Sequence, residues 1–480
     1  MRKFLTSPVG TLLTGLGLLL AFTPQAFASG GDLHQQAEEI GRGLGWTWAI
    51  PFAGMLLSIA IFPLLAPGFW SRHFGKVAAA WSLAYLIPFV AAHGFELGLY
   101  QLVHTALTEY VPFIILLLTL FTITGGVHLS GTLVGGPAVN TGLLLLGTLL
   151  ASWMGTTGAA MLLIRPLIRA NSHRKYKAHT VVFFIFLVAN IGGCLTPFGD
   201  PPLFLGFLKG VSFFWTMQHL LLPMLFLVAI LLPLYFLLDS FLFRREGRPT
   251  PAKGKKAKLK LEGTGNLLLL VAVVACVLAS GMWRPDQGFE VFHVHIELQN
   301  LLRDLALLGL TAASLTITSA ELRHRNSFEW EPMEEVAKIF AGIFVSMIPA
   351  IAILRAGTEG ALAGVVGLVG HDGVHDPAMF FWLTGILSSL LDNAPTYLVF
   401  FNVAGGDAQA LMAEVQTLLA ISAGAVFMGA NSYIGNAPNF MVRSIAESCG
   451  VKMPSFFGYM LWSVGILIPC FGLLTLLFFR

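Results

Sequence analysis

Ser388-Ser-Leu-Leu-Asp-Asn-Ala-Pro-Thr396 is a polar segment inside a long apolar run, and it decides how the rest of the chain is understood. A second such segment, Asn431-Ser-Tyr-Ile-Gly-Asn-Ala-Pro-Asn439, interrupts the next apolar run. The first half of the chain holds a matching pair, Trp153-Met-Gly-Thr-Thr-Gly-Ala159 and Asn190-Ile-Gly-Gly-Cys-Leu-Thr-Pro-Phe-Gly-Asp-Pro-Pro202. Irregular backbone at membrane depth persists only where protein buries it or where it lines a wet cavity. An Asp in such a place is a functional candidate, because burying its charge is costly.

The composition indicates a polytopic membrane protein. Of the 480 residues, 56% are hydrophobic and only 11% are charged, against about 25% charged in soluble domains. We find no soluble catalytic domain, nucleotide-binding loop, ATPase motif or nucleic-acid patch in the sequence, so we expect no enzyme activity, no cofactor and no nucleic-acid partner. An ion gradient then has to supply the energy of any transport.

The N-terminus has the pattern of a secretory signal peptide over residues 1–28. A basic start at Met1-Arg-Lys3 precedes the apolar run Leu12 to Phe22, and Ala26-Phe-Ala28 fits a small-x-small cleavage site. The alternative is an uncleaved first transmembrane helix. Cleavage would place the polar lead-in over residues 29–45 in the periplasm of a bacterial cell, with the protein in the inner membrane.

Ten stretches are apolar and long enough to cross about 30 Å of hydrocarbon. They cover residues 46–66, 77–92, 111–129, 178–208, 215–242, 267–282, 300–319, 336–354, 418–445 and 456–479. The segments around Gly155-Thr-Thr-Gly158 and Ser388–Thr396 are expected to be re-entrant hairpins, because each arm is too short to span. Glu96–Tyr110 is expected to be an amphipathic surface helix.

Each half of the chain shows the same order of spans, hairpin, broken span and final span. Five crossings per half, an odd number, invert the second copy relative to the first, and such repeats form transporter sites near the midplane. We therefore predict an all-α polytopic inverted-repeat transporter with about ten transmembrane helices, two re-entrant hairpins and two broken helices. The first repeat covers 46–242, a basic cytoplasmic linker 243–263, and the second repeat 264–480. Most of the 28 Lys and Arg residues fall in the predicted cytoplasmic loops, as the positive-inside rule requires.

A broken helix exposes backbone carbonyls and N–H groups, and nearby hydroxyls and amides add neutral oxygen ligands that suit Na⁺. The candidate cation-binding residues are Thr156, Thr157, Asn190, Thr196, Ser388, Ser389, Asn393, Asn431, Ser432 and Asn436.

Two carboxylates, Asp392 and Asp200, are the candidates for exchanging H⁺ and Na⁺. Desolvation favours the protonated form of a carboxylate and a nearby cation favours the charged form, so one group can hold either ion. A buried Asp⁻ would also repel an anionic substrate. The structural alternatives are that Asp392 caps the second hairpin arm and that Asp200 is a turn or cap residue before its two prolines.

These motifs together resemble the ion transporter superfamily, and within it the NhaD-type sodium/proton antiporters and their citrate-transporter relatives. The resemblance covers roughly residues 46–479. It implies a scaffold and a transport domain in each protomer, a homodimer, and elevator-type alternating access. By position, the cation-site roles of the family are carried over to Thr156, Thr157, Asp200, Ser389, Asp392, Asn393 and Asn436.

One departure concerns the first hairpin tip. NhaD-type members commonly carry an Asp-Asn pair at both tips, whereas this chain has Gly155-Thr-Thr-Gly158 at the first. A Na⁺(Li⁺)/H⁺ antiporter is the predicted function, with Na⁺ and H⁺ as the transported ions. A Na⁺- or H⁺-coupled citrate or dicarboxylate carrier remains the alternative, with a small organic anion as substrate. Membrane lipids are the expected surroundings, and the basic segment Lys253–Lys260 matches an anionic lipid surface.

Overall fold

A computed structural model describes residues 30–250, 258–285, 287–371 and 374–479. The predicted signal peptide and the centre of the basic linker lie outside the described residues. The described residues group into two compact units. One contains the residues up to Leu118 with Cys276–Gly309 and Glu329–Val366, and the other contains Thr119–Ala275, Leu310–Phe328 and the residues from Gly367 onward.

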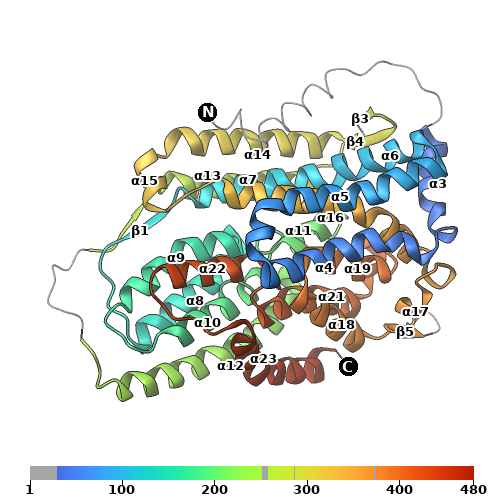
Figure 1. The fold of residues 1–480 in the computed structure, drawn as a ribbon. Helices are drawn as coiled ribbons and strands as arrows, with labels where there is room; N and C mark the ends of the chain where they lie inside the picture. The colour runs from blue at the N-terminus through green and yellow to red at the C-terminus, as the bar shows by residue number, and fades with distance from the viewer. Residues whose placement is uncertain (1–29, 251–257, 286, 372–373, 480) are drawn as a thin grey trace. The chain divides into compact units, whose positions relative to one another are not determined.

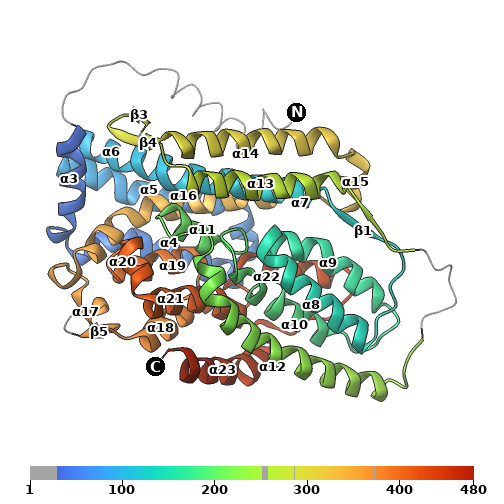
Figure 2. The same cartoon turned by 180° about the vertical axis from the view of Figure 1, so that it is seen from behind.

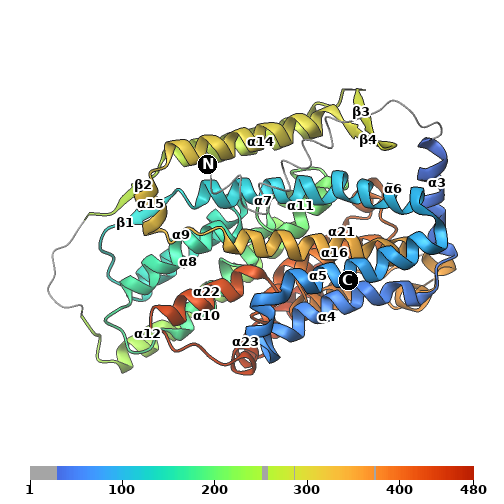
Figure 3. The ribbon, with the colours of Figure 1, turned by 45° about the horizontal axis from the view of Figure 1, so that its top comes forward.

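The first unit is built from long apolar helices. α4, α5 and α16 pack side by side, with α6 against α5 (Figure 3). Its elements are α3 (Gly30–Glu39), α4 (Ile50–Leu65), α5 (Pro67–His93), α6 (Phe95–Thr105), β3 (Gly288–Val291), β4 (Val294–Glu297), α16 (Glu331–Arg355) and α17 (Ala363–Val366). Three further helices, α7 (Val111–Thr124), α13 (Gly265–Met282) and α14 (Leu298–Ile317), contribute residues to both units.

The expected surface helix over Glu96–Tyr110 is wrong. α6 continues through a π-helical turn, Ala106–Tyr110, into α7, so that Phe95–Thr124 is one apolar stretch long enough to cross a membrane. Gln101 in this stretch meets protein instead of water, because the Tyr85 hydroxyl donates to Gln101 Oε1 at 2.5 Å and both residues are buried. The polar side chain of Gln101 is therefore satisfied inside the first unit.

The second unit contains both hairpins and both broken helices. Figure 1 shows α8, α9, α10 and α22 side by side, and Figure 2 shows α12 with α21 and α23. Its elements are β1 (His128–Ser130), α8 (Pro137–Met154), α9 (Thr156–Ala170), α10 (Ala178–Leu187), α11 (Pro201–Leu208), α12 (Trp215–Arg245), β2 (Lys260–Glu262), α15 (Ala320–Arg325), β5 (Gly370–His371), β6 (Val374–His375), α18 (Pro377–Leu390), α19 (Asn393–Val403), α20 (Ala408–Ala413), α21 (Val415–Met428), α22 (Ala437–Ser448) and α23 (Phe456–Phe478). The three strand pairs β1–β2, β3–β4 and β5–β6 are short and antiparallel.

Each hairpin turns where the sequence has its polar tip. α8 and α9 meet at Gly155, whose φ of +81° is a conformation that favours glycine. The two ends of this hairpin lie together, because Gly135 N–H, just before α8, donates to Ala170 O at the end of α9 at 2.8 Å. α18 and α19 meet at Leu391 and Asp392.

Both broken helices restart at a proline-bearing first turn. α10 ends at Leu187, a 3₁₀ turn covers Ile191–Cys194, and α11 begins at Pro201. α21 ends at Met428, a 3₁₀ turn covers Gly429–Asn431, and α22 begins at Ala437, directly before Pro438. Proline suits the first turn because the N–H it lacks has no intrahelical partner there.

The fold class is confirmed. Nine helices in the described part of the chain are long and apolar enough to cross a membrane, and shorter apolar helices accompany them. One of the nine is α8, which at 18 residues is longer than the short arm expected for the first hairpin. Long apolar helices with almost no sheet make this an all-α polytopic membrane protein.

Candidate functional site

The two breaks repeat the same hydrogen bonds. We define the first break as residues 190–200 and the second as residues 429–436. The Thr196 hydroxyl donates to Ser152 O and accepts from Phe198 N–H, while the Ser432 hydroxyl donates to Ser389 O and accepts from Ile434 N–H. The same register places Asp200 opposite Asn436, each four residues after its hydroxyl. Thr196 and Ser432 therefore tie each break to the adjacent hairpin tip and are already occupied.

Asp200 is the meeting point of the two breaks and the two hairpin tips. Its Oδ1 accepts from Asn436 Nδ2 at 3.1 Å and from the Thr156 hydroxyl at 3.4 Å. Its Oδ2 accepts from Asn393 Nδ2 at 2.5 Å. Asp200 is 1% exposed. Of the sequence candidates, the structure thus brings Thr156, Asn393 and Asn436 directly onto Asp200.

Asn190 and Asn436 are linked across the two breaks. Asn436 Nδ2 also donates to Asn190 Oδ1 and to Ala189 O, each at 3.2 Å. Asn190 Nδ2 in turn donates to Asn439 Oδ1 at 2.7 Å. Asn439 was quoted in the motif but was not among the candidate residues. The repeat of Asn at the fourth and seventh positions after Ser432 is the only sequence signal that could have suggested it.

A second polar group lies beside the second hairpin tip. The Ser389 hydroxyl donates to Gly385 O at 2.7 Å and accepts from Asn431 Nδ2 at 2.9 Å. The Ser388 hydroxyl donates to Ala425 O at 2.7 Å. The buried Oδ1 of Asn431 has no hydrogen-bond partner among the described residues. Ser388 and Ser389 are therefore tied to backbone, and Asn431 is the member with an oxygen still available for a cation.

Asp392 and Thr157 lie near the tips but not on Asp200. Asp392 Oδ1 accepts from Ala394 N–H at 3.0 Å, so the side chain is the N-cap of α19. The residue is half-buried. Thr157 is the second residue of α9 and is also half-buried. Asp392 thus occupies the capping position that was its structural alternative. The cap uses only Oδ1, so Oδ2 is not engaged by it.

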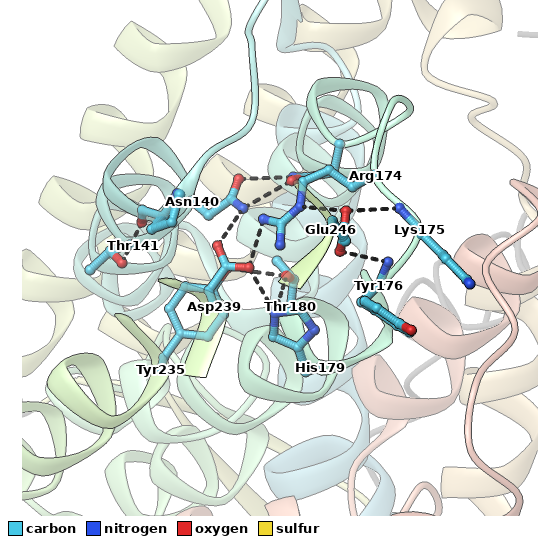
Figure 4. Close-up of polar contacts among 12 residues, drawn as sticks. Asn140, Thr141, Arg174, Lys175, Tyr176, His179, Thr180, Tyr235, Asp239 and Glu246 are labelled. Carbon is cyan, nitrogen blue, oxygen red and sulfur yellow. Dashed lines mark hydrogen bonds and ion pairs between the residues drawn. The ribbon is translucent and has the colours of Figure 1, made fainter. Parts of the chain in front are cut away.

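A different buried carboxylate shows what a structural Asp looks like in this protein. Asp239 Oδ1 accepts from Arg174 Nη1 at 2.7 Å and lies 2.8 Å from His179 Nε2, while Oδ2 accepts from Asn140 Nδ2 at 3.0 Å (Figure 4). The Tyr235 hydroxyl donates to Oδ2 at 3.2 Å. Sequence reasoning missed this cluster, because its residues are far apart in the chain and match no motif.

The cluster around Asp239 fixes the base of the first hairpin. It joins the start of α8, the start of α10 and the end of α12, and the loop after α9 contributes Arg174. Arg174 Nε also lies 3.6 Å from Glu246 Oε2. Burial, followed by the neighbouring Arg174 charge, lowers the pKa of His173 in the same loop. Charges here are matched by fixed partners, so the cluster has the character of a structural clamp.

Asp200 differs from Asp239 in having only neutral donors. Within the part of the chain that the structure describes, Asp200 makes no ion pair with Lys, Arg or His. A buried carboxylate whose donors are all neutral keeps an unbalanced negative charge, so a proton or a mobile cation stabilises it. The Thr156 hydroxyl and the partnerless Oδ1 of buried Asn393 are neutral oxygens of the kind that complete a Na⁺ shell. The residues present therefore fit exchange of H⁺ and Na⁺.

Comparison with known proteins identifies one family. The family described as "Putative citrate transport" matches residues 41–479, which is nearly the whole chain. No curated protein matches the sequence. The match includes both hairpins, both breaks and Asp200. The chain therefore belongs to this citrate-transport family, and it is a multi-pass membrane protein of the secondary-transporter type.

Proposed function

We propose that this protein is a Na⁺(Li⁺)/H⁺ antiporter in which Asp200 is the exchanging carboxylate. The observation that carries the proposal is the contrast between two buried aspartates of one unit. Asp239 is matched by Arg174 and His179, whereas among the described residues Asp200 faces only the neutral donors of Thr156, Asn393 and Asn436. The missing positive charge at Asp200 is then supplied by the ions that are transported.

The exchange would follow from competition for one carboxylate. With Asp200 ionised, Na⁺ would bind it together with Thr156 Oγ1 and Asn393 Oδ1. Protonation would remove the negative charge and release Na⁺, and the opposite change would reload the site. Asp392, at the neighbouring tip, would contribute a second negative charge that attracts the cation toward the site.

The elevator-type movement implied by the family resemblance is part of the proposal. Both hairpins and both breaks fall within one compact unit of the described chain, so the ion-binding residues could move as one body. The Asp239 clamp supports this, because it fixes the base of the first hairpin to α10 and α12 of the same unit.

A citrate or dicarboxylate carrier is the second candidate. Helices α9, α11, α19 and α22 begin at Thr156, Pro201, Asn393 and Ala437, so several helix N-termini lie at the breaks and tips. Helix N-termini favour anions, and the description of the family names citrate. With Asp200 protonated, its charge would no longer oppose an anionic substrate.

Purified protein in liposomes with an internal pH dye separates the two candidates. Na⁺ is added with no organic anion present. A prompt proton flux that depends on Na⁺ and is lost in Asp200→Asn is the expected result. No flux with Na⁺ alone, followed by transport once citrate or succinate is added, would reject antiport and make Asp200 a coupling-ion ligand of a carboxylate carrier.

A further inference from the structure

The amides around Asp200 differ in whether other groups fix their orientation. A backbone carbonyl only accepts hydrogen bonds, so an amide atom facing a carbonyl has to be the nitrogen. Asn439 Nδ2 lies between Gly429 O and Ser432 O at 2.8 and 2.9 Å. This orients Asn439 so that its Oδ1 faces Asn190.

The same reasoning fixes Asn190 and Asn436. Asn190 Nδ2 donates to Ile185 O at 2.8 Å, so its Oδ1 faces Asn436. Asn436 Nδ2 faces Ala189 O in addition to Asn190 Oδ1. Asn436 therefore presents N–H, never C=O, to Asp200 Oδ1.

Asn393 has no such constraint. The contact of its Nδ2 with Asp200 Oδ2 is the only hydrogen bond that its side chain makes among the described residues, and its buried Oδ1 has no partner there. Turning this amide over would break no other hydrogen bond. Its Oδ1 could then accept a proton carried by Asp200 Oδ2.

The corresponding positions of the two repeats show that a break can be built without these two amides. In the register that pairs Thr196 with Ser432, Asn190 corresponds to Val426 and Asn439 to Leu203. Val426 is 0% exposed and Leu203 is 1% exposed. The amides Asn190 and Asn439 thus correspond to apolar residues in the opposite repeat. This points to a role of the two amides in the site rather than in folding.

We propose that Asn190 and Asn439 are positioning residues that hold Asn436 as a permanent donor to Asp200 Oδ1, so that the exchanged proton binds Oδ2, where Asn393 reverses its amide to accept it. This inference rests on the proposed antiport. When Na⁺ leaves, a proton from the aqueous phase bonds to Oδ2, the carboxylate becomes neutral, and the Asn393 N–H bond is replaced by an O–H bond to Asn393 Oδ1. Oδ1 of Asp200, held by two donors, stays an acceptor in both states.

The test measures Na⁺-driven proton flux of the full chain in liposomes over a series of Na⁺ concentrations and pH values. The double variant Asn190→Val/Asn439→Leu installs the residue types found at the corresponding positions of the opposite repeat, Val426 and Leu203, so neither of the two amides is left without the other. Without Asn190, only Ala189 O still holds the Asn436 nitrogen, so turning this amide over breaks one hydrogen bond instead of two. A turned Asn436 accepts a proton carried by Asp200 Oδ1, which strengthens protonation of Asp200. We expect the Na⁺ half-saturation to rise by up to about tenfold at neutral pH, the upper end of what one neutral hydrogen bond contributes, and to return to the wild-type value at alkaline pH.

Two variants of Asn393 test the reversing amide. Asn393→Thr supplies a hydroxyl, which can donate and accept, and we expect exchange to persist. Asn393→Val has nearly the same shape as Asn393→Thr but can neither donate nor accept a hydrogen bond, and we expect exchange to be lost. Asn402→Leu, a buried amide of the same helix α19 that donates to Leu398 O, is the control for the removal of an amide.

The outcomes separate this inference from the antiport itself. A wild-type protein without Na⁺-driven proton flux overturns both. If the wild type exchanges and the double variant is unchanged, or is weakened by the same factor at every pH, Asn190 and Asn439 are structural only and the inference fails. Normal exchange in Asn393→Val overturns it as well, because then no reversing amide is required.

Discussion

Asp200 and Asn436 occupy the same position in the two breaks and are joined by a hydrogen bond of 3.1 Å from Asn436 Nδ2 to Asp200 Oδ1. Each is the residue before the first turn of the restarting helix, α11 or α22. A pair of equivalent positions in contact is what an inverted repeat produces at its pseudo-two-fold axis. One member is charged and the other neutral, so the site has two similar halves with a single buried carboxylate between them.

Asp200→Asn should abolish Na⁺-driven proton exchange without a large loss of stability. Asparagine keeps an acceptor for the Asn436 and Thr156 donors, but its neutral amide cannot exchange a bound proton for Na⁺. Proton flux in liposomes, with the melting temperature in detergent as the control, checks this. Wild-type flux in Asp200→Asn would remove Asp200 from the mechanism.

Asp392 can be tested for charge and for capping separately. Asparagine and aspartate are comparable N-caps, whereas alanine lacks the acceptor and typically destabilises a helix by about 1 kcal/mol. We expect Asp392→Asn to lose exchange with normal expression, and Asp392→Ala to lose both exchange and stability. Expression level, melting temperature and flux measured on both variants decide. Full transport in Asp392→Asn together with a defect in Asp392→Ala would reduce Asp392 to the cap of α19.

The sequence was informative wherever a polar residue interrupts an apolar run. The two tips and the two breaks follow from Gly, Pro, Asn and Asp at places where a membrane helix should continue. The same signal is local, so it could not show that Asn393 and Thr156, from different hairpins, donate to the same carboxylate.

Long-range polar clusters and helix continuity could not be predicted in this way. Asn140, Arg174, His179 and Asp239 meet only after α8, α10 and α12 pack together. The segment Glu96–Tyr110 was expected to be an amphipathic surface helix, although its Gln101 is bonded to buried Tyr85. In both cases the partner of a polar residue lies outside the window that a sequence pattern covers.

Exchanging Asp200 and Asn436 tests how asymmetric the site is. If only the presence of one carboxylate at the axis mattered, Asp200→Asn/Asn436→Asp would restore the exchange that Asp200→Asn loses. We expect no restoration, because Asn190 Oδ1 and Ala189 O, which now accept from Asn436, would face a carboxylate that cannot donate. Proton flux of the single and double variants, compared at equal protein amount, gives the answer. Recovery in the double variant would show that the fixed amides do not select the position of the charge.

The Asp239 clamp should matter for stability more than for ion exchange. Arg174→Met leaves Asp239 and Glu246 buried without their guanidinium, and breaking a buried ion pair from one side typically costs about 3–5 kcal/mol. Arg174→Met/Asp239→Asn removes both charges of the pair and should recover much of that loss. Glu447→Gln, in the exposed Arg443–Glu447 pair of α22, is the matched control and should change stability by less than about 0.5 kcal/mol. Unfolding in detergent measures all three, and equal destabilisation by Arg174→Met and Glu447→Gln would show that burial gives the clamp no special role.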